Sequence, residues 1–132
     1  MTDLRRTPRR WLLGLLTMVL AVTLMSTAHA RWINFSGKTA VFNVAGGGLQ
    51  VEYFSRFGKA YLWKPSNGRI IKGSWSIVNR NQMRFRFGSF QQFVFLGSLT
   101  NMTLAVCSGD PFQLSKLQKP KLSIAQMRQR CR

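Results

Sequence analysis

Residues 58–87, GKAYLWKPSNGRIIKGSWSIVNRNQMRFRF, decide the fold because they encode two consecutive β-hairpins. A first strand, Lys59–Lys64, leads into the turn Pro65–Gly68, where Asn-Gly tolerates the left-handed backbone positions that hairpins require. The chain then returns through residues 69–78. Gly73 marks either a bulge or a close approach of two backbones within this return strand.

The strand that follows the turn Asn79–Asn81 has the cleanest pattern in the chain. Residues 83–87, MRFRF, alternate apolar side chains with Arg84 and Arg86. The apolar side must face a core, because exposing three large side chains to water would cost about 1.5–3 kcal/mol each. The arginines then point outward. The apolar residues of the two hairpins that we expect in the core are Tyr61, Trp63, Trp75, Met83, Phe85 and Phe87.

Flanking segments predict further strands, rich in β-branched and aromatic residues and bounded by turn residues. They are Trp32–Phe35, Thr39–Val44, Leu49–Phe54, Gln91–Leu96 and Met102–Cys107. Gly46–Gly48 predicts a turn, Gly97-Ser98 separates the last two strands, and the period of two puts Glu52 on a polar face. The fold class is therefore all-β: an antiparallel meander of about seven or eight short strands. A small barrel is favoured over a sandwich, because consecutive hairpins need no long crossover.

The chain ends in a polar and basic tail at about residues 111–132, with Pro120 in its middle. Residues 123–130, SIAQMRQR, contain helix-forming side chains, and Ser123 is a suitable N-cap. A short C-terminal helix is predicted there.

Residues 1–30 have the pattern of a bacterial signal peptide. Arginines precede the apolar run at residues 11–25, and Ala28-His29-Ala30 predicts cleavage between Ala30 and Arg31. An uncleaved anchor is the alternative, although the run is short of the about 20 residues that span a membrane. The twin-arginine route is less favoured than general secretion, because the run is strongly apolar. We expect a single exported β-domain, residues 31–132, periplasmic or fully secreted.

Cys107 and Cys131 are the only cysteines. An even count behind a secretion signal predicts a disulfide, rather than two free thiols. In the chain-entropy model the bridge contributes about 3 kcal/mol. Because the exported chain has no histidine, these two cysteines do not predict a zinc site.

Three short motifs resemble a group of small exported bacterial proteins of uncharacterised function. The motifs are Tyr61-Leu62-Trp63-Lys64-Pro65, Gly73-Ser74-Trp75 and Phe85-Arg86-Phe87. The resemblance covers residues 60–87, under a third of the exported chain. The group has a cysteine where this chain has Arg84, so Cys107 here needs Cys131 as its partner. The resemblance implies no activity.

Catalysis is disfavoured by composition. His29, the only histidine, leaves with the leader, which excludes a Ser-His-Asp triad. Glu52 and Asp110 are the only acids after residue 30, and Asp110 precedes Pro111, where it suits a turn. No Ser-x-x-Lys begins a credible helix. We therefore expect a non-catalytic protein without metal or cofactor.

Positive charge is the dominant feature of the exported chain. Its 16 basic residues outnumber two acids, for a net charge of +14, because Arg5, Arg6, Arg9, Arg10 and Asp3 lie in the leader. Such a surface concentrates anions. The candidate anion-binding residues in or beside the second hairpin are Arg69, Lys72, Arg80, Arg84 and Arg86. Those of the tail are Lys116, Lys119 and Lys121, with Arg128, Arg130 and Arg132 nearby.

The expected ligand is an anionic envelope component: anionic lipid, lipopolysaccharide or an acidic polysaccharide. Nucleic acid is disfavoured as a ligand, because base stacking needs aromatic rings on the arginine side, and in MRFRF they alternate to the opposite side. The alternative function is a protein-interaction or inhibitor module with an acidic protein target. Charge that serves only solubility is a further alternative.

Overall fold

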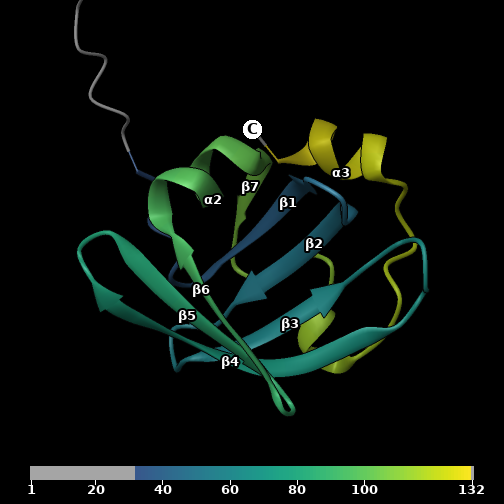
Figure 1. The fold of residues 1–132 in the computed structure, drawn as a ribbon. Helices are drawn as coiled ribbons and strands as arrows, with labels where there is room; N and C mark the ends of the chain where they lie inside the picture. The colour runs from purple at the N-terminus through teal and green to yellow at the C-terminus, as the bar shows by residue number, and fades with distance from the viewer. Residues whose placement is uncertain (1–31, 132) are drawn as a thin grey trace, which may run out of the picture. The chain divides into compact units, whose positions relative to one another are not determined.

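Seven strands form one antiparallel sheet in the computed structural model, which describes residues 32–131 (Figure 1). The predictions of a leader at 1–30 and of cleavage at Ala30–Arg31 lie outside the described residues. The strands are β1 (Lys38–Val44), β2 (Gly48–Phe54), β3 (Lys59–Trp63), β4 (Ile70–Asn79), β5 (Gln82–Phe87), β6 (Phe90–Phe95) and β7 (Thr103–Ser108). The predicted all-β fold class is confirmed.

The sheet order is β6-β5-β4-β3-β2-β1-β7, so the first six strands form an unbroken meander. Helix α2 (Leu96–Met102) then carries the chain to the opposite edge, where β7 pairs with β1. The sheet curls into a half-barrel around α2, and no second sheet stacks on it within the described residues (Figure 1). Of the two architectures expected, the structure therefore adopts the barrel-like one.

The two central hairpins form as predicted. Strands β3 and β4 pair with Tyr61 opposite Lys72, and β4 and β5 pair with Trp75 opposite Phe85. Gly73 marks a close approach rather than a bulge, because a Cβ there would collide with the backbone oxygen of Arg86 and the ring of Phe87. The register shift in β4 lies instead between Ile77 and Asn79.

The concave, inner side of the sheet holds the larger core cluster. Alternate residues of β1, β2, β4 and β5 meet there with the apolar side of α2. Its members include Phe42, Phe54, Trp75, Met83, Phe85, Leu96 and Leu99. The Trp75 indole N–H donates a 2.9 Å hydrogen bond to the carbonyl oxygen of Ser55, so this buried polar atom is paired.

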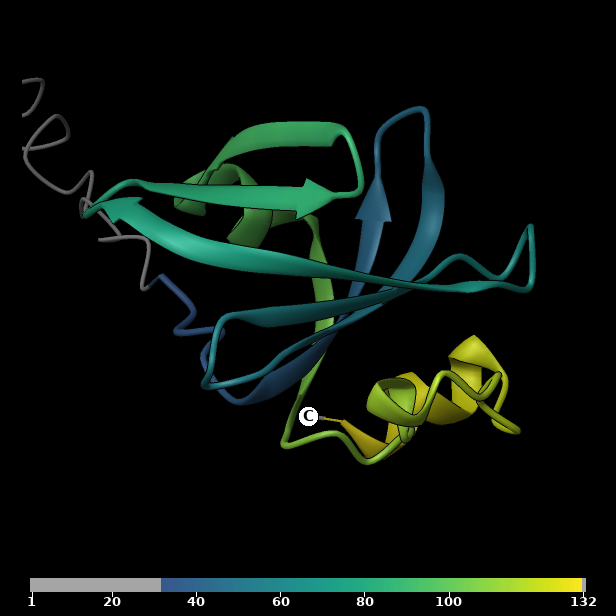
Figure 2. The same cartoon turned by 90° about the horizontal axis from the view of Figure 1, so that it is seen from below.

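The outer side of β1–β3 is also buried, because the C-terminal segment covers it (Figure 2). Val51, Tyr61 and Trp63 pack there against the tail residues Phe112, Leu114, Met127 and Cys131. The tail contains the 3-10 turn η1 (Leu114–Lys116) and helix α3 (Ile124–Arg130). Five of the six predicted core residues are therefore buried, on two opposite sides of the sheet, and Phe87 is partly buried.

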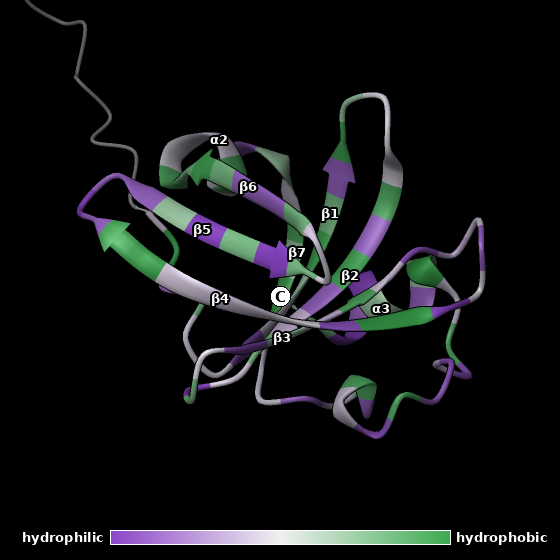
Figure 3. Ribbon diagram, turned by 60° about the horizontal axis from the view of Figure 1, so that its bottom comes forward, coloured by the Kyte–Doolittle hydropathy of each residue, from purple (hydrophilic) through white to green (hydrophobic). Residues whose placement is uncertain are grey.

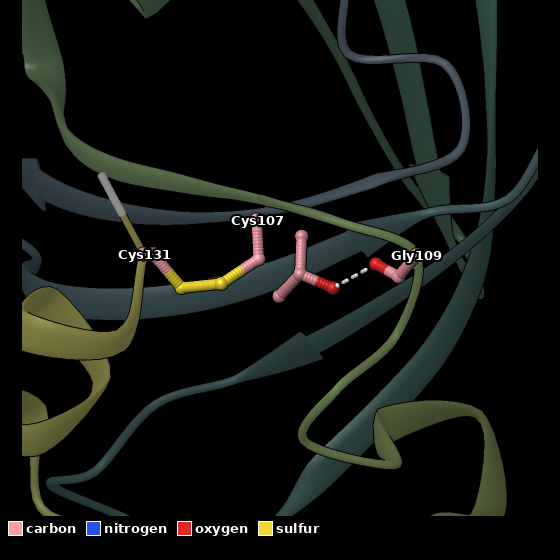
Figure 4. Close-up of a disulfide and its surroundings, with 4 residues drawn as sticks. Cys107, Gly109 and Cys131 are labelled. Carbon is pink, nitrogen blue, oxygen red and sulfur yellow. Dashed lines mark hydrogen bonds between the residues drawn. A yellow bond between two sulfur atoms is a disulfide. The ribbon is translucent and has the colours of Figure 1, made fainter.

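Local signals in the tail were sufficient to predict its helix. Ser123 is the N-cap: its hydroxyl accepts from the Gln126 N–H at 3.3 Å, and its own N–H donates to Gln126 Oε1 at 2.8 Å. Cys131 ends the helix and forms the predicted disulfide with Cys107 of β7 (Figure 4). Beside it, the Thr39 hydroxyl donates a 2.6 Å hydrogen bond to the Gly109 carbonyl oxygen.

Two expectations are wrong, and one connection has a form that was not predicted. Trp32–Phe35 is not a strand; it is an irregular segment in which Phe35 enters the inner core and the Ile33 N–H donates to Thr100 Oγ1 at 3.3 Å. Gly97-Ser98 separates the last two strands as expected, but it does so within the helix α2, where Leu96 and Leu99 lie three residues apart and bury the same helix face. Glu52 is not on a polar face, since its side chain points into the half-barrel and is buried.

Candidate functional site

Arg84 and Arg86 lie exposed on the outer, convex side of β5. Directly opposed residues in an antiparallel pair point to the same side of the sheet, so Ser76 and Ser74 of β4 accompany them. Lys72 projects from β4 to the same side, because it stands opposite the outward-facing Tyr61. The alternation of hydrophilic and hydrophobic residues along β5 is visible in Figure 3.

Strand β6 adds aromatic rings to this side. Phe93 stands opposite Arg84, and Phe95 stands opposite Gln82. Their side chains are 49% and 63% exposed, and Arg86 Nη2 donates a 3.3 Å hydrogen bond to Gln91 Oε1. The expectation that rings and arginines lie on opposite sides holds within β5 alone. We call the set Lys72, Arg84, Arg86, Phe93 and Phe95 the arginine face.

The acidic residues of the described chain lie away from the arginine face. Glu52 is buried on the inner side of the sheet. The Asp110 carboxylate accepts hydrogen bonds from the Leu114 N–H at 2.8 Å and from the Ser115 N–H at 2.8 Å, and another from the Ser115 hydroxyl. Asp110 therefore organises the turn η1, which confirms its expected turn role.

The structure does not bring the remaining candidate cations into one patch. Arg69 lies in the β3–β4 loop, and Arg80 lies in the β4–β5 turn at the far end of the same strand. Lys116, Lys119 and Lys121 are exposed on the tail. Of the eight candidate anion-binding residues, three therefore belong to the arginine face.

A cavity of about 620 Å³ lies on the opposite, concave side of the sheet. Most of its walls are apolar side chains of β1, β4–β6 and α2, including Phe42, Val44, Ile71, Phe85, Phe87, Val94, Leu99 and Met102. Polar groups in the lining are Gln50, Glu52, Lys64 and Gln92.

Glu52 is the unusual residue of this cavity. Its side chain is 6% exposed, and its Oε1 atom has no hydrogen-bond partner. Burial raises the pKa of this carboxyl from 4.5 to about 8, so its neutral form predominates at pH 7. The sequence pattern missed this site, because the alternation in β2 shows which residues share a side and not which side is covered.

No cluster of three or more His, Cys, Asp or Glu suited to a metal ion occurs within residues 32–131. In the same part of the chain, no helix is long and apolar enough to cross a membrane. Comparison of the chain with protein-family models, with curated proteins and with solved structures found no match.

Proposed function

We propose that this is a non-catalytic exported protein that binds phosphate-bearing anionic lipid of the bacterial envelope through its arginine face. The observation that carries the proposal is the β5–β6 pairing, which sets exposed Phe93 and Phe95 beside Arg84 and Arg86. Guanidinium groups bind phosphate oxygens bidentately. Phenylalanine side chains beside basic residues are typical of surfaces that insert into the boundary between head groups and acyl chains.

Charge and compartment support the same proposal. A net charge of +14 on residues 31–132 attracts an anionic surface over a distance set by ionic strength. Each Lys or Arg near such a surface contributes about 1 kcal/mol to binding. The disulfide between Cys107 and Cys131 is consistent with an oxidising, exported location.

Vesicle sedimentation tests the proposal. Disulfide-bonded protein is mixed with phosphatidylglycerol-containing vesicles, with phosphatidylcholine vesicles, with lipopolysaccharide and with an acidic polysaccharide that has no acyl chains. We expect strong binding to the anionic vesicles and to lipopolysaccharide, weakening steeply with salt. Failure to bind anionic vesicles at low salt overturns the proposal.

Matched variants distinguish binding through the arginine face from binding through net charge alone. Arg84→Ala with Arg86→Ala removes two exposed charges from the face, whereas Lys119→Ala with Lys121→Ala removes two from the tail. We expect the first pair to lower vesicle affinity by about tenfold or more, equivalent to at least about 1.4 kcal/mol, and the second pair to lower it much less. Equal losses would assign binding to net charge alone.

Variants of the two exposed phenylalanines distinguish lipid from other polyanions as the ligand. Phe93→Ser with Phe95→Ser should weaken vesicle binding and leave polysaccharide binding unchanged, because only lipid offers an apolar phase. Single-stranded DNA is a further arm, because rings beside arginines also suit base stacking. Tight DNA binding together with indifference to vesicles would contradict the proposal.

An open sheet edge favours the protein-interaction alternative. The outer edge of β6, Phe90–Phe95, pairs with no other described strand, and its sequence FQQFVF has neither charge nor proline. Such an edge can accept a strand from a partner protein. Capture from an envelope extract should then show a shallow dependence on salt, whereas lipid binding through the arginine face should show a steep one.

A further inference from the structure

The concave cavity is large enough to hold a small molecule. Its volume of about 620 Å³ falls within the about 300–1,000 Å³ of ligand sites in proteins. The space is a half-open pocket, so a ligand can reach it from solvent. It lies on the opposite side of the sheet from the arginine face.

Three of the four polar groups of the cavity lie on β2 or directly after β3, and the fourth, Gln92, lies on β6. Glu52 of β2 stands opposite Leu62 of β3. Lys64 is two residues beyond Leu62 and points to the same inner side, level with Gln50. Side chains on this diagonal of an antiparallel pair lie within reach of one group held between them.

Glu52 and Lys64 are the only charged residues in the lining, and no ion pair joins them. The remaining lining residues of β1, β4, β5, β6 and α2 are uncharged. A buried carboxyl oxygen without a partner costs free energy, so a ligand that hydrogen-bonds to Glu52 recovers that cost.

The charges in and around the cavity select the ligand's head group. A protonated Glu52 donates one hydrogen bond and therefore needs an acceptor oxygen. The Lys64 ammonium favours an anion, and the excess positive charge of the protein disfavours a cationic ligand. A carboxylate can accept the hydrogen bond from Glu52 and pair with the charge of Lys64, and an apolar chain can pack against the apolar walls.

We infer that the cavity binds a long-chain fatty acid, whose carboxylate lies between Glu52 and Lys64 and whose chain packs on the apolar wall of β1, β5 and α2. The Glu52 hydroxyl donates to one carboxylate oxygen, and the Lys64 ammonium pairs with the other. This site is independent of the arginine face, so either proposal can fail alone.

The protonation state of Glu52 predicts how the affinity for a fatty acid changes with pH. Burial raises the pKa of Glu52 to about 8, and the carboxylate that forms above this pH would repel the fatty carboxylate. Lys64 is the other charged group in the lining of the cavity. Affinity should therefore be constant near pH 6–7 and fall as the pH rises through about 8 to 9.

Calorimetric titration of the disulfide-bonded protein with dodecanoate tests the inference. We expect one molecule bound per chain, and affinity up to about tenfold weaker at pH 9 than at pH 7, because the protonated fraction of a group with a pKa of about 8 falls about tenfold over this range. Glu52→Gln keeps a hydrogen-bond donor and does not ionise, so it should bind dodecanoate equally at both pH values. If wild-type affinity does not change with pH, the role of Glu52 is refuted.

Two lysine variants, one at the start of β3 and one directly after it, test the head-group contact. Lys64→Met should weaken dodecanoate binding about tenfold at pH 7, whereas Lys59→Met, on the outer side of β3, should leave it unchanged. Dodecanol should bind more weakly than dodecanoate and should not respond to Lys64→Met. Absence of dodecanoate binding, or tighter binding of dodecylamine, overturns the inference. Should Glu52→Gln fail to fold, the wild-type pH profile and the Lys64 variant still decide.

Discussion

Two regions on the outer side of one sheet meet different environments. At β2 and β3 the outward residues, among them Val51, Tyr61 and Trp63, are buried beneath the C-terminal segment. At β5 and β6 nothing in the described chain covers Arg84, Arg86 and their neighbours. The C-terminal segment buries apolar residues on one half of the outer side, and the other half remains an exposed, positively charged surface.

We call the C-terminal segment that packs on the outer side of β1–β3 the cover. The largest expected loss of stability comes from a substitution that disrupts its packing. Leu114 is fully buried in the outer cluster, whereas Leu117, three residues on, is 52% exposed. Leu114→Asp would bury an unpaired carboxylate and should lower the free energy of unfolding by about 4 kcal/mol or more. Urea denaturation measures this, with Leu117→Asp as the control at about 0.5 kcal/mol or less. Similar losses for both variants would show that the tail is not a structural cover.

The buried Glu52 on the concave side predicts that the free energy of unfolding changes with pH by on the order of a few kcal/mol. Glu52 has a folded-state pKa of about 8, above its ordinary value of 4.5, so the folded protein binds the proton more tightly than the unfolded chain. Stability should therefore fall as the pH rises from about 4.5 to 8 and level off above. Glu52→Gln should remove this fall in denaturation curves taken across that range. A wild-type curve independent of pH would contradict the burial of Glu52.

Removing the disulfide should lower the free energy of unfolding by about 3 kcal/mol. Cys107→Ser with Cys131→Ser detaches the end of the cover from β7, while leaving the packing of Met127 and Leu114 in place. Thermal unfolding measures the loss. Intact mass should rise by two hydrogens on reduction of the wild-type protein, and an unchanged mass would show that the bridge is absent.

Gly73 lies in β4, where the covered half of the sheet meets the bare half. A methyl group there would meet the Arg86 carbonyl and the Phe87 ring, so Gly73→Ala should destabilise the protein by about 1–3 kcal/mol. Gly47→Ala is the control, because its new Cβ meets the end of the flexible Gln50 side chain at 3.1 Å and Val44 at ordinary contact distances of 3.4 and 3.5 Å. Equal stability of the two variants in urea would show that β4 and β5 have room to separate.

The arginine face should contribute least to stability. Arg84→Ala with Arg86→Ala should change the free energy of unfolding by about 0.5 kcal/mol or less, because both side chains are exposed and meet no acid. The same protein should lose vesicle affinity. A large loss of stability would mean that the bare half is covered by another molecule in the folded state.

Local patterns predicted much of this fold. The hairpins between residues 58 and 87 follow from turn residues and alternation, and the α3 cap follows from Ser123 and Gln126. Errors occurred where tertiary contacts outweigh local preference. Trp32–Phe35 has strand-forming residues but finds no strand to pair with, and α2 forms because Leu96 and Leu99 fill the inner core.

The candidate sites were only half predictable. Arg84 and Arg86 could be assigned to the surface from the sequence, since a core does not accept two unpaired guanidinium groups. The rings beside them come from β6, and only strand register reveals that neighbour. The Glu52 cavity was missed altogether, because β2 is covered on both sides by segments distant in sequence.

By itself, the sequence determined most of the strands, their turns and which residues share a side of a strand, because these depend on neighbours along the chain. For β5 it also showed which side is bare, whereas for β2 and β3 only the tertiary structure decided which sides are buried. Burial depends on what packs above a strand, and here the cover comes from α2 on one side and from the disulfide-linked tail on the other.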